Sequence, residues 1–320
     1  MSTKTQSVSR VRKIVSVLSK YGIYLAFIIM CVVFGAVNPA FLTPGNFINI
    51  LRQISFNAIL AMGMTMVIIT GGIDLSVGSV LALSAVVTAS FVQTENPLLP
   101  VPLALLVGLI IGAACGAFNG IVITKGKLPP FIVTMVMMTM ARGAAQLFTK
   151  GRPVSGLLES FDFLGQGSLL GIPVPVYILA LIVLIAYHIL NNTKTGRYIY
   201  AVGGNEQAAK ASGIKSHRVK IFVYIFSGIM SALVGIIMSA RLNSASPILG
   251  DGYELDAIAA AVIGGTSMDG GRGRVIGTLV GALIIGTITN GLDILNVSSY
   301  WQQIIKGAII LIAVLADKKD

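Results

Sequence analysis

The stretch VIITGGIDLSVGSVLAL, residues 67–83, ends one long apolar run and begins another with no polar loop between them. Gly71 and Gly72 let the backbone turn at once, because glycine has no side chain to restrict it. Asp74 and Ser76 are suited to cap the following helix, because their side-chain oxygens can accept hydrogen bonds from its free backbone N–H groups. We therefore predict a tight turn here, covered by other parts of the protein.

The composition of the whole chain is that of a protein embedded in a membrane. Of its 320 residues, 55% are hydrophobic and 11% are charged, and the mean hydropathy is +0.88. Ordinary soluble domains contain about 25% charged residues. We expect an all-α membrane protein with a single transmembrane domain over 1–320, and the alternative is an unusually hydrophobic soluble protein.

Ten apolar segments fit helices that cross a bilayer, which requires about 20 residues each. Because the number of crossings is even, both termini are expected on the same side of the membrane. The predicted spans are 21–38, 47–70, 75–92, 101–124, 129–149, 174–191, 218–240, 254–267, 274–291 and 298–316.

The basic residues predict the orientation of these spans. Of the 23 lysines and arginines, 17 fall on the side of the N-terminus, 5 fall on the other side, and Lys306 lies within the last span. Lysine and arginine are enriched in cytoplasmic loops. Both termini are therefore expected in the cytoplasm, with 1–20 as a basic tail. Positive charges in short clusters between spans do not indicate a nucleic-acid partner.

Rows of glycine predict where helices pack closely. Small residues at four-residue spacing let two membrane helices approach each other. The fourth and ninth predicted spans carry such rows at Gly108, Gly112, Gly116 and Gly120, and at Gly277 and Gly281. A second glycine-rich break, VIGGTSMDGGRGRVIG at 262–277, resembles the first and also falls on the cytoplasmic side.

The cytoplasmic segment 192–219 contains a predicted short helix. Asn205 is a good N-cap, Glu206 suits the first turn, and Gly213 supplies the C-terminal stop. A helix of about two turns is unstable alone, so it should dock on its own spans or on a partner. Its alanines, including Ala208 and Ala209, form a face of small residues.

No arrangement typical of an enzyme is present in the sequence. His188 and His217 have neither metal-ligand spacing nor a base–orienter relation. Cys31 and Cys115 lie within predicted spans and are expected to be packing residues. The sequence lacks a phosphate-binding loop, GxxxxGK followed by Ser or Thr. We predict no metal or nucleotide site in this chain.

Polar side chains within the predicted spans are candidates for a translocation path, because such groups usually face the interior of a helix bundle. Arg142 with Gln146, and Gln302 with Lys306, share helix faces at i,i+4 spacing. The alternative for each residue is a hydrogen bond between helices. The candidates are Asn57, Asn119, Arg142, Gln146, Asp256, Asn290, Gln302 and Lys306.

Several long blocks together resemble one known family. GGIDLSVGS (71–79), GRYIYAVGGNEQAAKASGI (196–214), GYELDAIAAAVIGGTS (252–267) and GGRGRVIGT (270–278) are similar to the permease subunits of ribose-type ABC importers. The resemblance covers nearly the whole chain and implies a type II importer permease fold in a bacterial cytoplasmic (inner) membrane.

The resemblance also implies partners. It implies a second permease copy, a separate ATPase that binds ATP and Mg²⁺, and an extracytoplasmic sugar-binding protein received partly by the outer loop 150–173. It places the contact with the ATPase at Asn205, Glu206, Ala208, Ala209 and Gly213.

Two other classes stay open at this point. A sugar–cation symporter would use intramembrane ionisable groups such as Asp256 and Lys306. A membrane-bound enzyme would need a catalytic constellation that the sequence does not offer.

Overall fold

Six long apolar helices form the framework of the molecule. The computed structural model describes residue 25 and residues 27–317. Within this range, 6 helices are long and apolar enough to cross a membrane, and each overlaps a predicted span. The all-α membrane fold is thus confirmed, while the count of ten crossings stays a prediction. The six are α2 (Pro44–Ile69), α4 (Val101–Gly126), α5 (Pro130–Thr149), α7 (Val174–Asn192), α10 (Ser216–Leu242) and α12 (Val275–Ile294).

Four other helices occupy the remaining predicted spans: Phe27–Val37, α3 (Val77–Phe91), α11 (Tyr253–Ile263) and α13 (Ser299–Asp317). At 1.5 Å per residue, α3 is about 22 Å long and α11 about 16 Å long. Both are shorter than the hydrocarbon core of about 30 Å. The predicted span 254–267 is helical only as far as Ile263. Helix α11 ends early because two glycines follow it, the second with a φ of 86°.

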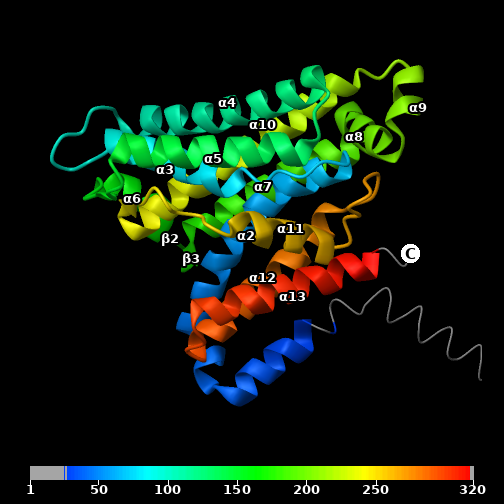
Figure 1. Ribbon diagram of the computed structural model, residues 1–320. Coiled ribbons are helices and arrows are strands. Elements are labelled where there is room, and N and C mark those ends of the chain that lie inside the picture. The colour runs from blue at the N-terminus through cyan, green and yellow to red at the C-terminus, as the bar shows by residue number, and fades with distance from the viewer. Residues whose placement is uncertain (1–24, 26, 318–320) are drawn as a thin grey trace, which may run out of the picture.

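The described ends of the chain point in one direction. In Figure 1, the helix Phe27–Val37 begins, and α13 ends, toward the same end of the molecule. The predicted tail 1–20 and the start of the first predicted span lie outside the described residues. The cytoplasmic location of both termini stays a prediction.

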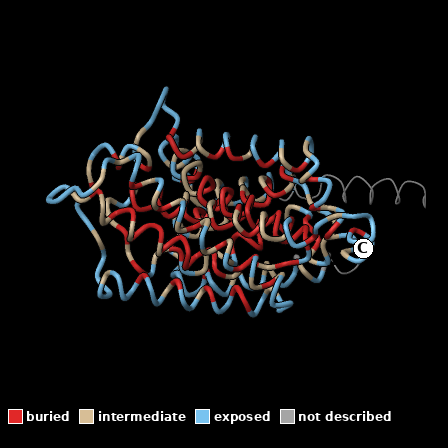
Figure 2. The backbone as a smooth tube through the Cα atoms, turned by 90° about the horizontal axis from the view of Figure 1, so that it is seen from above, coloured by how far each residue is buried: buried red, intermediate tan, exposed pale blue. Residues whose placement is uncertain are grey.

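Helices α2 and α10 form the centre of the bundle. In their apolar segments, 89% and 72% of the residues are buried, compared with 22% in α4. Helix α10 packs against α2, α3 and α4. Figure 2 shows buried residues concentrated along the middle of the molecule, with exposed residues on its flanks. The apolar side chains that α4, α5 and α7 leave exposed are suited to face lipid.

The glycine rows pack as the sequence predicts. A Cβ atom on Gly112 would lie 2.2 Å from the carbonyl oxygen of Gly228, and one on Gly116 would lie 2.1 Å from that of Tyr224. The backbones of α4 and α10 therefore touch. On α12, a Cβ on Gly281 would lie 2.0 Å from the carbonyl oxygen of Ala260 in α11.

Short elements lie at the two ends of the bundle (Figure 1). A 3₁₀ helix, η1 (Pro39–Leu42), precedes α2. One end carries α6 (Glu159–Gln166) and two small antiparallel sheets, in which β1 (Val154–Ser155) pairs with β4 (Ser244–Ala245), and β2 (Ser168–Leu169) with β3 (Ile172–Pro173). The opposite end carries α8 (Lys194–Gly204) and α9 (Glu206–Ala211).

Candidate functional site

The bundle covers the glycine turn between α2 and α3 at Gly72, as predicted, whereas Gly71 is exposed. Gly71 has a φ of 77°, in the left-handed region that favours glycine. Gly72 is buried, and a Cβ atom there would lie 2.5 Å from the hydroxyl oxygen of Tyr224 on α10. Any side chain at position 72 would therefore displace this tyrosine.

Asp74 accepts three hydrogen bonds inside the bundle. Its side chain accepts from the backbone N–H of Ser76 at 3.0 Å, from the Ser76 hydroxyl at 2.6 Å and from the Ser227 hydroxyl at 2.8 Å. Asp74 is 1% exposed. Its partner Ser227 lies about three turns from the start of α10, so Asp74 bonds to the middle part of that helix.

The predicted capping role is right for Asp74 in part and wrong for Ser76. Ser76 is the N-cap of α3, but its side chain makes no capping hydrogen bond. Its hydroxyl instead donates to Asp74 and accepts from the side-chain amide of Asn119 at 3.0 Å. Asn119, a path candidate, is thus committed to packing between α3 and α4.

Three chain segments meet at a group that we call the glycine junction: Gly203, Gly270 and Gly271 around the carbonyl oxygen of Ile69. The N–H of Gly271 donates to Ile69 O at 2.8 Å. A Cβ atom on Gly203 would lie 1.7 Å from the same oxygen. The end of α8 therefore touches both glycine-rich turns directly.

Helix α9 has the ends that the sequence predicts. The Asn205 side chain accepts from the N–H of Ala208 at 2.9 Å. At the other end, Gly213 has a φ of 82°, and the N–H of Ile214 donates to Ala209 O at 3.0 Å. Helix α8, which precedes it, is absent from the sequence prediction.

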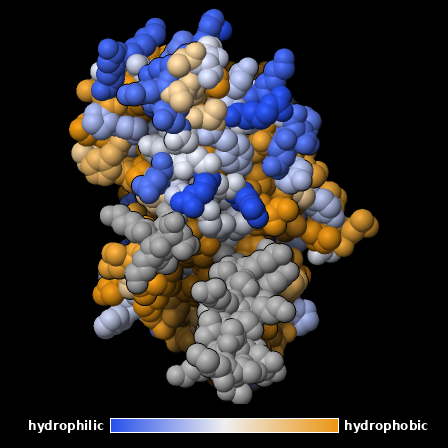
Figure 3. All heavy atoms as spheres, turned by 90° about the vertical axis from the view of Figure 1, so that its right-hand side faces the viewer, coloured by the Kyte–Doolittle hydropathy of each residue, from blue (hydrophilic) through white to orange (hydrophobic). Residues whose placement is uncertain are grey.

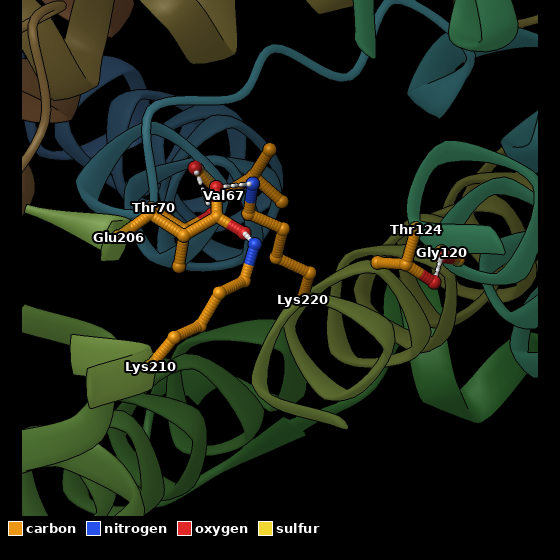
Figure 4. Close-up of polar contacts among 7 residues, drawn as sticks. All are labelled: Val67, Thr70, Gly120, Thr124, Glu206, Lys210 and Lys220. Carbon is orange, nitrogen blue, oxygen red and sulfur yellow. Dashed lines mark hydrogen bonds and ion pairs between the residues drawn. The ribbon is translucent and has the colours of Figure 1, made fainter. Parts of the chain in front are cut away.

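Glu206 fastens α9 to α10. Its carboxylate pairs with Lys210 at 2.9 Å and with Lys220 of α10 at 2.6 Å, as Figure 4 shows. Burial acts to raise the pKa of Glu206, but the hydrogen bonds and charges of Lys220 and Lys210 outweigh it, so the pKa lies below its usual value. The carboxylate is therefore ionised at neutral pH.

The exposed face of α9 is not the one that the sequence predicts. Ala209 is only 5% exposed and packs in the main hydrophobic core. Gln207, Ala208 and Ala211 are exposed instead. The expectation that Ala209 contacts a partner protein is therefore wrong. Ala209 packs α9 against its own chain, because a helix of six residues needs one face to dock on the bundle.

Two adjoining cavities bring five of the eight path candidates together. One cavity, of about 370 Å³, is lined by residues that include Asp256, Gln302 and Lys306. The other, also of about 370 Å³, is lined by residues that include Arg142 and Gln146. Asp251 and Glu254 line both cavities, so these seven residues form one continuous region, which we call the polar surface.

The polar surface is held by specific bonds. Lys306 Nζ lies 2.8 Å from Asp256 Oδ2, which joins α13 to α11. Arg142 Nη1 donates to the carbonyl oxygens of Pro247 at 2.8 Å and Leu249 at 3.0 Å. These charges thus brace α11 and the loop before it, while Gln146 on α5 stays exposed.

Asn57, Asn119 and Asn290 do not line either cavity. Asn57 is 3% exposed within α2. Asn290 and Asn46 exchange side-chain hydrogen bonds of 3.0 and 2.9 Å between α12 and α2. These asparagines fit the alternative stated for each candidate, which is hydrogen bonding or packing between helices.

Sequence reasoning missed Asp251, because it lies outside the predicted spans. The available signal was its position close to Glu254 in the segment GDGYE.

The chain belongs to a family of membrane transport permeases. The family model described as the permease component of a branched-chain amino acid transport system matches residues 46–314. The resemblance read from the sequence is thereby confirmed, and the chain is a transport subunit rather than an enzyme.

The relatives within this class have names that specify sugars. The chain is 50% identical over 298 residues to the ribose import permease protein RbsC of Haemophilus influenzae, covering 92% of this chain and 91% of the relative. It is 49% identical over 306 residues to RbsC of Bacillus subtilis (95% and 94% covered), and 40% identical over 303 residues to the D-allose transport system permease protein AlsC of Escherichia coli (93% and 91%). No solved structure matches the chain.

Proposed function

We propose that this chain is the permease subunit of an ATP-driven importer that moves ribose, or a closely similar monosaccharide, across a bacterial cytoplasmic (inner) membrane. The proposal rests on sequence identity. The chain is 50% and 49% identical to two proteins named as ribose import permeases, over more than nine-tenths of both chains. ATP and Mg²⁺ belong to a separate ATPase, and sugar is delivered by an extracytoplasmic binding protein.

The polar surface supports the assignment of a path. It offers amide, carboxylate and ammonium groups, which can exchange hydrogen bonds with the hydroxyls of a sugar. Gln146, Gly143 and Thr139 of α5 are exposed at its edge. A second copy of the chain facing this edge would enclose the path between two such surfaces.

The end of the molecule that carries α8 and α9 supports the proposal that this end contacts the ATPase. Figure 3 shows hydrophilic residues gathered over the upper part of this end and hydrophobic residues along its sides. Helix α9 presents Gln207, Ala208 and Ala211 outward, while α8 contacts both glycine-rich turns through the glycine junction. A displacement of α9 by an ATPase would thus reach the starts of α3 and α12.

Reconstitution tests this proposal. Proteoliposomes containing the chain, the ATPase and the sugar-binding protein should take up ribose only with ATP. Ala208→Asp should abolish co-purification of the ATPase, because burying an unpaired charge in the contact costs several kcal/mol, roughly 3–5. Ser160→Asp, on the exposed surface of α6, is the control. Ribose uptake without the ATPase would instead support a symporter using Asp256 and Lys306.

A further inference from the structure

A basic cavity of about 570 Å³ lies beside α9, apart from the polar surface. Its walls come from the end of α4, the start of α5, α9 and the start of α10. The charged residues that line it are Lys127, Lys210, Lys215, Lys220 and Glu206. Four cations against one carboxylate favour an anionic occupant.

The lysines divide into two pairs. Lys210 and Lys220 are both bound to Glu206 (Figure 4). Lys127 and Lys215 form no ion pair with any described residue. The second pair therefore has its charge available for a ligand.

A buried hydroxyl in the same wall lacks a partner. Ser216 is 2% exposed and lines the cavity, and its Oγ has no hydrogen-bond partner among the described residues. Such a group costs free energy unless something bonds to it. Ser216 is also the first residue of the 27-residue helix α10, whose dipole favours an anion at this end.

Apolar residues continue from the cavity onto the side of the bundle. Leu128 lines the cavity, and Phe131 and Ile132 follow in the first turn of α5. They are 45%, 52% and 45% exposed. A soluble anion would make no use of this apolar strip, whereas the acyl chains of a lipid would cover it.

We propose that this cavity binds the phosphate group of an anionic phospholipid, with Lys127, Lys215 and Ser216 as its ligands and the acyl chains along the start of α5. The site requires that the chain spans a membrane, but it does not depend on which solute the chain transports.

Lipid retention measures the site directly. The full-length chain, purified with phosphatidylglycerol, should retain a lipid detectable by native mass spectrometry and show a melting temperature raised by phosphatidylglycerol over phosphatidylcholine. Lys127→Gln should lower the affinity for this lipid about fivefold, which is the effect of one lysine at a membrane surface. Lys150→Gln is the matched control, since Lys127 and Lys150 end α4 and α5 in the same left-handed conformation, with φ of 52° and 51°.

Ser216→Ala separates a ligand from a packing defect. With a bound phosphate, the variant should lose phosphatidylglycerol affinity. Without a ligand, removing an unpaired hydroxyl should leave lipid affinity unchanged and stabilise the chain, as expected for Ser84→Ala, whose Oγ is likewise buried and unpartnered. That result, or equal effects of Lys127→Gln and Lys150→Gln, would overturn the proposal.

Two other outcomes would also overturn the lipid assignment. Inorganic phosphate that binds as well as phosphatidylglycerol, with the same dependence on Lys127, would assign the cavity to a soluble anion. A dependence on Lys127 and Lys215 seen only in co-purification of the ATPase would assign it to that interface.

Discussion

Asp74 explains why the glycine pair before it is needed. The carboxylate lies among Ser76, Ser227 and, through Ser76, Asn119, all within the bundle. The chain reaches this position by turning sharply after α2 beside Tyr224, whose hydroxyl leaves no room for a side chain at Gly72. The turn residues and the acid thus serve one purpose, which is to join α3, α4 and α10 through a polar centre.

Removing the Asp74 carboxylate should destabilise the chain. Asp74→Ala leaves two serine hydroxyls and one N–H without their acceptor, at about 1–3 kcal/mol for each buried donor left unpaired. We expect a lower melting temperature and less monodisperse protein by size-exclusion chromatography. Asp269→Ala, at an exposed aspartate of the second glycine-rich turn, should behave like wild type. Equal melting temperatures for the two variants would contradict this account.

The pairing of Glu206 predicts a pH dependence for α9. Pairing with Lys220 and Lys210 lowers the pKa of Glu206 in the folded chain below its usual value. The pairing therefore stabilises the docked helix above the unfolded pKa and is lost as the pH falls through the folded pKa. After correction for intrinsic rates, hydrogen exchange in α9 should accelerate at pH values well below 4.5. Glu206→Gln should show the faster exchange already at pH 7 and little further change on acidification. A wild-type pH profile in Glu206→Gln would contradict the assignment.

At the scale of elements, local signals were predictable and orientation was not. The ends of α9 follow from Asn205 and Gly213, because caps depend on residues adjacent in sequence. Helix α8 was missed because its glycines at 196, 203 and 204 lower its helix propensity, although Thr193 caps it with a bond to Gly196 N. The direction in which Ala209 faces depends on tertiary packing.

The glycine junction predicts a contrast between two neighbouring residues. A Cβ atom on Gly203 would lie 1.7 Å from Ile69 O, whereas one on Gly204 would meet nothing within 4 Å. Gly203→Ala should therefore separate α8 from the turns, lowering the melting temperature and binding-protein-stimulated ATP hydrolysis. Gly204→Ala should leave both near wild type. Similar losses in both variants would mean that helix propensity, not contact, is responsible.

At the scale of the whole molecule, the sequence predicted polar candidates but not their grouping. Arg142, Asp256 and Lys306 come from separate helices and meet on the polar surface. Asn290 looks equally polar in sequence, yet it pairs with Asn46, 244 positions away. Only the packing of α2 against α12 distinguishes these roles. The fold class was predictable because hydropathy acts along the chain, whereas the site depends on contacts between distant helices.

The proposed pairing of two copies gives a test of the whole path. In a variant with Cys31 and Cys115 replaced by alanine, Gly143→Cys on the exposed edge of α5 should form a disulfide between two copies in membranes. Leu184→Cys on α7, 66% exposed on an apolar face, should remain unlinked. Cross-linking at position 184 alone would place the second copy on another face.

The contact between Gly112 and Gly228 has a consequence for motion. It is reciprocal: a Cβ on either residue would lie 2.2 or 2.1 Å from the carbonyl oxygen of the other. Sliding α4 along α10 by one turn would put Tyr224 or Ala232 in the place of Gly228, with its side chain against the carbonyl oxygen of Gly112. Helices α4 and α10 therefore pack in one register and move together as a rigid pair. Any change in shape during a transport cycle then falls on the contacts that this pair makes with α2, α3 and α5.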